Sequence, residues 1–251
     1  MPNKRELIQL YSQAPGAVAP AGIRFNDTLY AANLVGVNEQ TGALAGGLVP
    51  QMEQLLQNMQ ALVERAGCSL DNIGRCTGYV TRVEDRDPIY GPWDLLFPNA
   101  ADRPAFKVLV AALPAGQLVK LDMLAVVNGR RTRIDIDGVP ARDPTVKCGN
   151  WVFTSRVHGT DPATSKVKEG GLDAEFGQAF VNIVELVKLS GGGKHHISQV
   201  TAFLRDLSLA PKVAEHFART FPAGTAQPQY NVLQAFIGGH LSVMLEMSAA
   251  L

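Results

Sequence analysis

The sequence is poor in charge, and its charges cancel. Charged residues make up 18% of the 251 residues, and 23 Lys and Arg balance 23 Asp and Glu. A net charge of zero favours neither nucleic acid nor an anionic membrane as a partner. Because so few charges are available to cover the surface, we expect part of that surface to be buried in an oligomer.

Cysteines and long apolar runs are also scarce. The three cysteines, Cys68, Cys76 and Cys148, form no CxxC pair and leave an odd thiol, which suits a reducing compartment. Cys76 lies in an apolar stretch, where burial is expected rather than catalysis. The N-terminal stretch lacks the apolar core of a signal peptide, and no apolar run approaches about 18 residues. The sequence therefore predicts a cytoplasmic protein with no membrane partner.

One apolar pattern occurs twice. Val49–Ala66 carries apolar residues at the spacing of an amphipathic helix, with Pro50 in its first turn and Gly67 just after its end. Leu172–Ser190 carries the same stripe, with every position shifted by 124 residues. The paired positions are Met52 and Phe176, Leu55 and Ala179, Leu56 and Phe180, Met59 and Ile183, Leu62 and Leu186, Val63 and Val187, and Ala66 and Ser190. This period indicates an internal duplication.

The segments around the two helices follow the same order in each half. In the first half we predict strands at Thr28–Val37 and Ile73–Val83, a shorter helix at Ile89–Phe97, and a pair of strands in Ala105–Val127. In the second half we predict a strand at Trp151–Val157, a strand from Ile197, a shorter helix at Pro211–Phe221, and a pair of strands in Gln229–Met247. We predict two domains, residues 1–128 and 129–251, joined by the charged stretch Asn128–Asp137. Each is expected to be a β-β-α-β-α-β-β unit with its own core.

Each predicted strand pair has one apolar and one polar face. In Ala105–Val127 the strands are expected to pair with Leu113 opposite Leu118, so that Lys107, Lys120 and Asp122 share the polar face. The two lysines suit either an anion site or a chain contact.

The second copy has a different set of polar residues on this face. Around a two-residue turn at Gly238-Gly239, Asn231 and Glu246 are expected to lie opposite each other, with Gln229 beside them. This face suits either a functional pocket or a buried polar network.

Several segments resemble the RidA (YjgF, reactive intermediate deaminase) family. In the first half these are NEQTG, QNMQALVERAG, SLDNIGRCTGYV and RPAFKVLVAALPAG. In the second half they are WVFTSRV, FVNIVELVKLSGG and ISQVTAFLRDL. The resemblance implies an α+β, chorismate-mutase-like fold in each half, a mixed sheet with two helices on one face. It also implies homotrimers with pockets between chains.

Deaminating members of this family hydrolyse enamines or imines with an arginine, a glutamate, a serine and a tyrosine. The arginine position falls on Ala105 and Gln229, and the glutamate position on Lys120 and Met244. The serine position falls on Ala32 in the first half and is kept as Ser155 in the second; there the tyrosine position falls on Arg142. Glu246 lies one residue pair along from the family's glutamate and is expected to substitute for it.

The resulting prediction is a hydrolytic deaminase of a C=N or enamine bond in a small anionic metabolite, with no cofactor and no metal. Glu246 and Ser155 are the predicted catalytic residues. The predicted substrate-binding residues are Arg142, Arg156, Gln229, Asn231, Lys107 and Lys120. The alternatives are a non-catalytic ligand-binding or structural protein and, less favoured by the zero net charge, RNA cleavage.

The remaining histidines and aromatic residues carry weaker signals. His158 follows the Ser155 strand and is placed at a pocket mouth. His195 and His196 are adjacent and, with His216, are expected at the surface rather than in a zinc site. Tyr90 and Trp93 are expected to fill the core side of the shorter helix.

Overall fold

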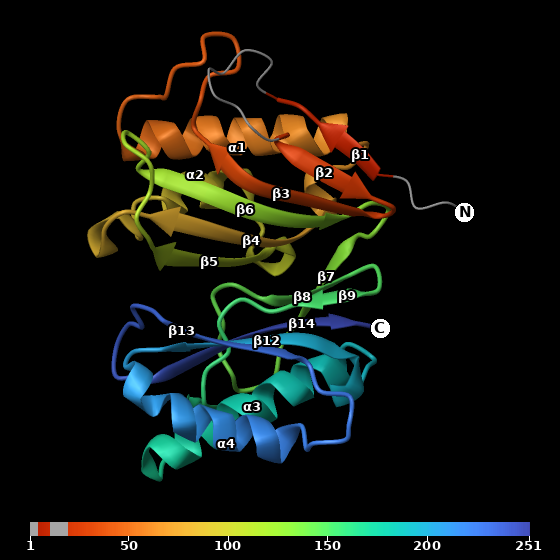
Figure 1. Ribbon diagram of the computed structural model, residues 1–251, viewed down its shortest axis with the longest axis vertical. Coiled ribbons are helices and arrows are strands. Elements are labelled where there is room, and N and C mark those ends of the chain that lie inside the picture. The colour runs from red at the N-terminus through yellow and green to blue at the C-terminus, as the bar shows by residue number, and fades with distance from the viewer. Residues whose placement is uncertain (1–4, 11–19) are drawn as a thin grey trace. The chain divides into compact units, whose positions relative to one another are not determined.

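The computed structural model describes residues 5–10 and 20–251. It divides into two compact units, Met1–Arg131 and Thr132–Leu251, and each is described by itself (Figure 1). No helix in the described part of the chain is long and apolar enough to cross a membrane.

The first unit is a mixed six-stranded sheet with two helices packed on one face. Its elements are β1 (Arg5–Ile8), β2 (Gly22–Phe25), β3 (Thr28–Val35), α1 (Leu48–Arg65), β4 (Ile73–Val80), α2 (Tyr90–Leu96), β5 (Ala105–Val110) and β6 (Val119–Val126). The strand order is β1-β2-β3-β6-β4-β5, with β4 and β5 parallel and the other described pairings antiparallel. The α1 stripe packs on the apolar residues of the sheet, and Tyr90 and Trp93 are buried there, as predicted.

The second unit repeats this architecture (Figure 1). Its elements are β7 (Arg131–Ile134), β8 (Thr145–Cys148), β9 (Trp151–Phe153), the short pair β10 (Thr160–Asp161) and β11 (Lys166–Val167), α3 (Gly171–Leu189), β12 (Ile197–Leu204), α4 (Ala210–Thr220), β13 (Gln229–Gln234) and β14 (Val243–Ala250). The strand order is β13-β12-β14-β9-β8-β7. The predicted class, two tandem α+β units with mixed sheets, is confirmed; each sheet has one strand more than expected.

The duplication extends to individual hydrogen bonds. On α1, Asn58 Nδ2 donates to the carbonyls of Val35 and Val37 at 2.8 and 2.9 Å. On α3, Asn182 Nδ2 donates to the carbonyls of His158 and Thr160 at the same two distances. Both asparagines are buried, and each attaches its long helix to the segment that follows the early strand.

The same segment approaches the helix backbone closely in both units. A Cβ atom on Gly36 would lie 2.3 Å from the carbonyl oxygen of Gln51, and one on Gly159 would lie 2.0 Å from that of Glu175. Neither distance is compatible with any side chain, so glycine is required at both positions. The buried Gln51 and Glu175 side chains in turn accept backbone N–H bonds from Leu118 and Ser242, at 2.9 and 2.7 Å.

The predicted strand pairs are wrong in both units. β4 lies between β5 and β6, and β12 lies between β13 and β14, so neither Ala105–Val127 nor Gln229–Met247 is a hairpin. The predicted faces of the strands are still correct, because Lys107 and Asp122 lie on either side of Thr77 in one row across the sheet. Side chains alternate along each strand whichever strand lies beside it.

The predicted linker makes more contacts than its charge suggested. Arg131 is buried and donates to the carbonyls of Asp102 and Leu70, and its guanidinium lies 5.3 Å from the centre of the Phe97 ring. Arg131 therefore anchors this stretch to the first unit.

Cys76 is fully buried, as expected, and burial raises the pKa of its thiol well above the ordinary value. His196 has a structural role: its Nδ1 accepts the N–H of Gly193 at 3.0 Å. The Asn72 side chain does the same for Ser69 in the first unit.

Candidate active site

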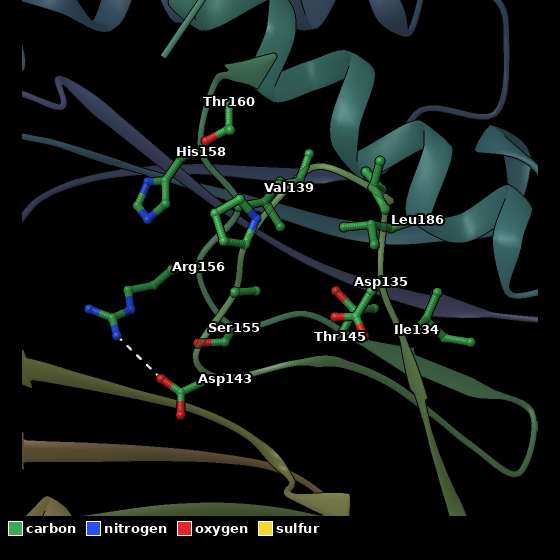
Figure 2. A pocket seen from close by; sticks show the side chains of 14 residues that line it. Ile134, Asp135, Val139, Asp143, Thr145, Ser155, Arg156, His158, Thr160 and Leu186 are labelled. Carbon is green, nitrogen blue, oxygen red and sulfur yellow. Dashed lines mark hydrogen bonds and ion pairs between the residues drawn. The ribbon is translucent and has the colours of Figure 1, made fainter. Parts of the chain in front are cut away.

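A pocket in the second unit lies where β9 ends, beside the segment that connects β7 to β8. It is lined by Ile134, Asp135, Ile136, Val139, Pro140, Ala141, Asp143, Thr145, Ser155, Arg156, Val157, His158, Thr160 and Leu186. Figure 2 shows Arg156, Asp143 and His158 on one side of it and Ile134 and Leu186 on the other. On this second side Asp135 and Thr145 lie beside Ile134 and Leu186, so the pocket has one polar wall and one wall of mixed character.

An ion pair forms part of the polar wall. Arg156 Nη2 lies 3.3 Å from Asp143 Oδ2, and the Asp143 side chain is only 2% exposed (Figure 2). The Arg156 side chain keeps 24% of its surface exposed. A buried carboxylate without a cation would be costly, so Asp143 holds the guanidinium at the pocket.

His158 contributes a neutral imidazole. Burial is the main cause that lowers its pKa from 6.5 to about 4, with a further contribution from the charge of Arg156. Its Nδ1 lies 3.5 Å from the carbonyl oxygen of Val243, a contact that favours a proton on Nδ1 and leaves the lone pair on Nε2. The Asn182 bond to the His158 carbonyl fixes the backbone that carries the ring.

Ser155 and Glu246 are neighbours across two strands. Phe153 pairs with Ser248, and Val157 forms a bridge with Leu245, so Ser155 and Glu246 lie between these two pairings. Both residues are buried. The structure therefore brings together the two residues predicted to be catalytic, and Ser155 and Arg156 both line the pocket.

The other predicted residues of this half lie elsewhere. Gln229 and Asn231 are exposed on the edge strand β13, three strand spacings of about 4.8 Å from β9, or roughly 14 Å. Asn231 and Glu246 lie on either side of Thr201 rather than opposite each other, so that predicted pairing is wrong. Arg142 is exposed, directly before Asp143.

Lys107 and Lys120 belong to the first unit. Lys107 is 3% exposed and its Nζ donates to Thr77 Oγ1 at 2.8 Å. Lys120 Nζ lies 3.5 Å from Asp122 Oδ1 and 5.1 Å from the centre of the Tyr79 ring. Within this unit, therefore, a neighbouring carboxylate already offsets the charge of Lys120.

Sequence reasoning missed Asp143 and the opposite wall of the pocket, which includes Ile134 and Leu186. Asp143 stands alone between Arg142 and Pro144, in a stretch with no periodic pattern, and its partner Arg156 is 13 residues away. Its place next to the predicted Arg142 was the only local signal. No group of three or more His, Cys, Asp or Glu side chains in the described residues is arranged to hold a metal ion.

The cavity volume of the pocket is small, about 40 Å³. By this measure roughly 10–15 Å³ is enough for one water, so the pocket admits water but not a whole metabolite. A substrate would have to bind at the mouth. The arrangement therefore offers a cation, a neutral base and a hydroxyl around a place for water, which is what hydrolysis of a polar double bond requires.

The comparisons with known proteins concern about half of the chain. The family model described as Endoribonuclease L-PSP matches residues 11–127. A RutC family protein of Aquifex aeolicus is 28% identical over 120 residues, which is 45% of this chain and 96% of that protein. The human 2-iminobutanoate/2-iminopropanoate deaminase is 28% identical over 119 residues, 46% of this chain and 85% of that protein.

Solved structures also match about half of the chain. A putative endoribonuclease L-PSP from Entamoeba histolytica is 25% identical and covers 49% of this chain and 100% of its own, with a TM-score of 0.46. The family match identifies the first unit as a member of the Endoribonuclease L-PSP family, also called RidA or YjgF, and the second unit repeats the strand order of the first.

Proposed function

We propose that this protein is a hydrolytic deaminase that acts on an enamine or imine of a small anionic metabolite, with water as the nucleophile and no cofactor. The observation that carries the proposal is the Arg156–Asp143 ion pair beside the neutral His158 in one pocket. The deaminase name of the human relative supports the same reaction class.

The roles follow from the chemistry of each group. Arg156, with Arg142 at the exposed rim, would hold the substrate's carboxylate at the mouth of the pocket. His158 Nε2 would take a proton from the enclosed water as its oxygen adds to the C=N carbon. Ser155 and Glu246 would orient this water. From a protonated imine, which an enamine becomes on gaining a proton at carbon, this addition gives a neutral carbinolamine. The ring would then return its proton to the nitrogen, the carbon–nitrogen bond would break to release ammonia, and the hydroxyl proton would pass to solvent as the keto acid forms.

The first unit supplies matched variants for a test. The positions equivalent to Ser155, Arg156 and His158, 123 residues earlier, are Ala32, Asn33 and Val35. Ser155→Ala, Arg156→Asn and His158→Val therefore install residues that the same fold already accepts. We expect His158→Val to lower kcat/KM by about 10² to 10⁴.

The assay is ammonia and keto-acid release from a panel of enamines and imines, with Glu246→Gln and Arg142→Ala beside these variants. Lys168→Gln is the control, since Lys168 pairs with Asp161 and does not line the pocket. Equal rates in the wild type and in all the pocket variants would exclude this site.

A second candidate is a non-catalytic ligand-binding or structural protein. It is favoured by the replacement of the family's arginine by Ala105 and Gln229, and by the small enclosed volume. Thermal stabilisation by a metabolite without release of ammonia would support it. RNA cleavage, in line with the family's description as Endoribonuclease L-PSP, would be supported by tight binding to RNA at physiological salt.

The proposal includes a homotrimer with pockets between chains. Gln229 and Asn231 on an edge strand, and Lys120 on the first sheet, would then reach substrate across a chain contact. Lys107 is buried within its own unit and would support this face from below. A stable monomer in light scattering would remove this part of the proposal. A cytoplasmic location remains a prediction.

A further inference from the structure

Each unit has a groove between its long helix and its short helix. In the second unit, residues of α3 and α4 together with Lys194 line a groove of about 300 Å³. In the first unit, residues of α1 and α2 line a groove of about 290 Å³. Every residue that lines the first groove has its counterpart, 124 positions later, in the lining of the second. The fold therefore builds the same groove twice, at a volume typical of small-molecule sites.

The two copies differ in charge. The first groove contains one charged residue, Glu53, among glutamines, leucines and a proline. The second is lined by Lys188, Lys194 and Arg219 with a single carboxylate, Glu185. Since the first groove has the same fold without these cations, the cations of the second groove are not needed to form the fold.

The cations of the second groove are held only by weak contacts. Lys188 Nζ lies 3.3 Å from Glu185, and Arg219 Nη2 lies 3.7 Å from Glu215; all four side chains are more than 40% exposed. Lys194 Nζ donates to the carbonyl of Thr220 at 3.2 Å. Exposed pairs of this kind contribute about 0–1 kcal/mol, so an anion in the groove can displace them.

The groove also has access to a buried imidazole. His216 is 6% exposed, and its Nε2 lies 3.1 Å from Asp173 Oδ1, which fixes the ring. Among the described residues, none forms a hydrogen bond with its Nδ1. Gly177 faces this edge of the ring, because a Cβ there would lie 3.3 Å from His216 Cε1 and 3.6 Å from Nδ1.

Glycine inside a helix costs about 1 kcal/mol relative to alanine, and the equivalent residue of the first unit is Glu53. Gly177 thus leaves the imidazole edge uncovered. The floor beside it is apolar: Phe180 lies parallel to the imidazole at 6.3 Å, and Val181 is 58% exposed.

From these observations we infer that the α3–α4 groove of the second unit binds a small carboxylate with a compact apolar body. The apolar body lies on Phe180 and Val181, the carboxylate meets Lys188 and Arg219, and His216 Nδ1 supplies a further polar contact. The site is separate from the Ser155–Arg156 pocket, with which it shares no lining residue.

The test uses benzoate as the probe, with benzamide as its neutral counterpart and benzylamine as its cationic one. Binding to the full chain is measured by NMR titration, with the imidazole signals of His216 assigned by comparison with His216→Gln. We expect benzoate to bind at least tenfold more tightly than benzamide, to shift the His216 signals, and to weaken as salt is raised.

Two variants copy the first unit. The first, called the rim variant, combines Lys188→Glu with Arg219→Leu and so installs the residues found at the equivalent positions Glu64 and Leu95. The second, Gly177→Glu, closes the groove with the residue found at the equivalent position Glu53. Each is expected to lower benzoate affinity at least tenfold, whereas Lys168→Gln, outside the groove, leaves it unchanged. The rim variant changes exposed side chains only, so it keeps the test decisive even if Gly177→Glu does not fold. Equal binding of benzoate and benzamide, unshifted His216 signals, or full affinity in the rim variant would overturn the inference.

Discussion

The low pKa of His158 predicts that the second unit loses stability in acid. Its pKa is lowered from 6.5 to about 4 in the folded chain, mainly by burial, so the unfolded chain binds the proton more readily between these values. The stability that the neutral ring contributes is therefore fully present above pH 6.5 and is lost as the pH falls toward 4.

The size of the effect follows from these two values. Between pH 8 and pH 5 the unfolded ring becomes protonated and the folded ring stays mostly neutral, which removes about 2 kcal/mol from the free energy of unfolding. His158→Val, which installs the residue of the first unit, should abolish this difference. The free energies of unfolding of the variant and the wild type should therefore converge as the pH is lowered.

Urea unfolding at pH 8, 7, 6 and 5 measures this difference. The chain has two tryptophans, Trp93 in the first unit and Trp151 in the second, so a Trp93→Phe background makes the fluorescence report on the second unit. His240→Gln, at an exposed position, is the control and should follow the wild type. If the free energies of His158→Val and the wild type keep a constant difference from pH 8 to pH 5, the reasoning is refuted.

Three further predictions concern contacts that stabilise each unit internally. Asn182→Ala removes two hydrogen bonds of a buried side chain and should lower the free energy of unfolding of the second unit, measured in urea, by about 2–4 kcal/mol; a loss under about 0.5 kcal/mol would contradict this. Gly159→Ala should lower the melting temperature by several degrees, because its Cβ meets backbone, whereas Gly46→Ala, with nothing within 4 Å, should not. Arg131→Met should destabilise the first unit by about 3 kcal/mol and leave Trp151 fluorescence transitions unchanged.

The sequence predicts the helices and the faces of the strands well, for a local reason. Helical spacing and the glycine after each long helix are properties of neighbouring residues, and Leu48–Arg65 and Gly171–Leu189 lie within one residue of the predicted bounds. The alternation that puts Lys107 on the polar face and Phe106 in the core is equally local.

Strand order and the pocket depend on distant partners. Alternation is the same whether β6 pairs with β5 or with β4, so nothing in Ala105–Val127 distinguishes a hairpin from strands separated by a third. The Arg156–Asp143 pair depends on the path of an irregular connection, which no periodicity describes. Ser155 and Arg156, which are neighbours in sequence, therefore line one pocket, and their predicted roles stay predictions. The predicted pairing of Asn231 with Glu246 is wrong, because it depended on a hairpin that the sheet does not contain.

The position of β6 between β3 and β4, and of β14 between β9 and β12, has a consequence for biosynthesis. In each unit the strand that joins the two parts of the sheet is made after all its neighbours. Until it is translated, β3 and β4 have no partner on their facing edges, and such edges are where nascent chains associate wrongly. β6 and β14 also bring Leu121, Met123, Leu245 and Met247 to their cores. Each core can therefore close only when its last strand has left the ribosome, so a pause in translation just before β6 or β14 would expose the chain to aggregation.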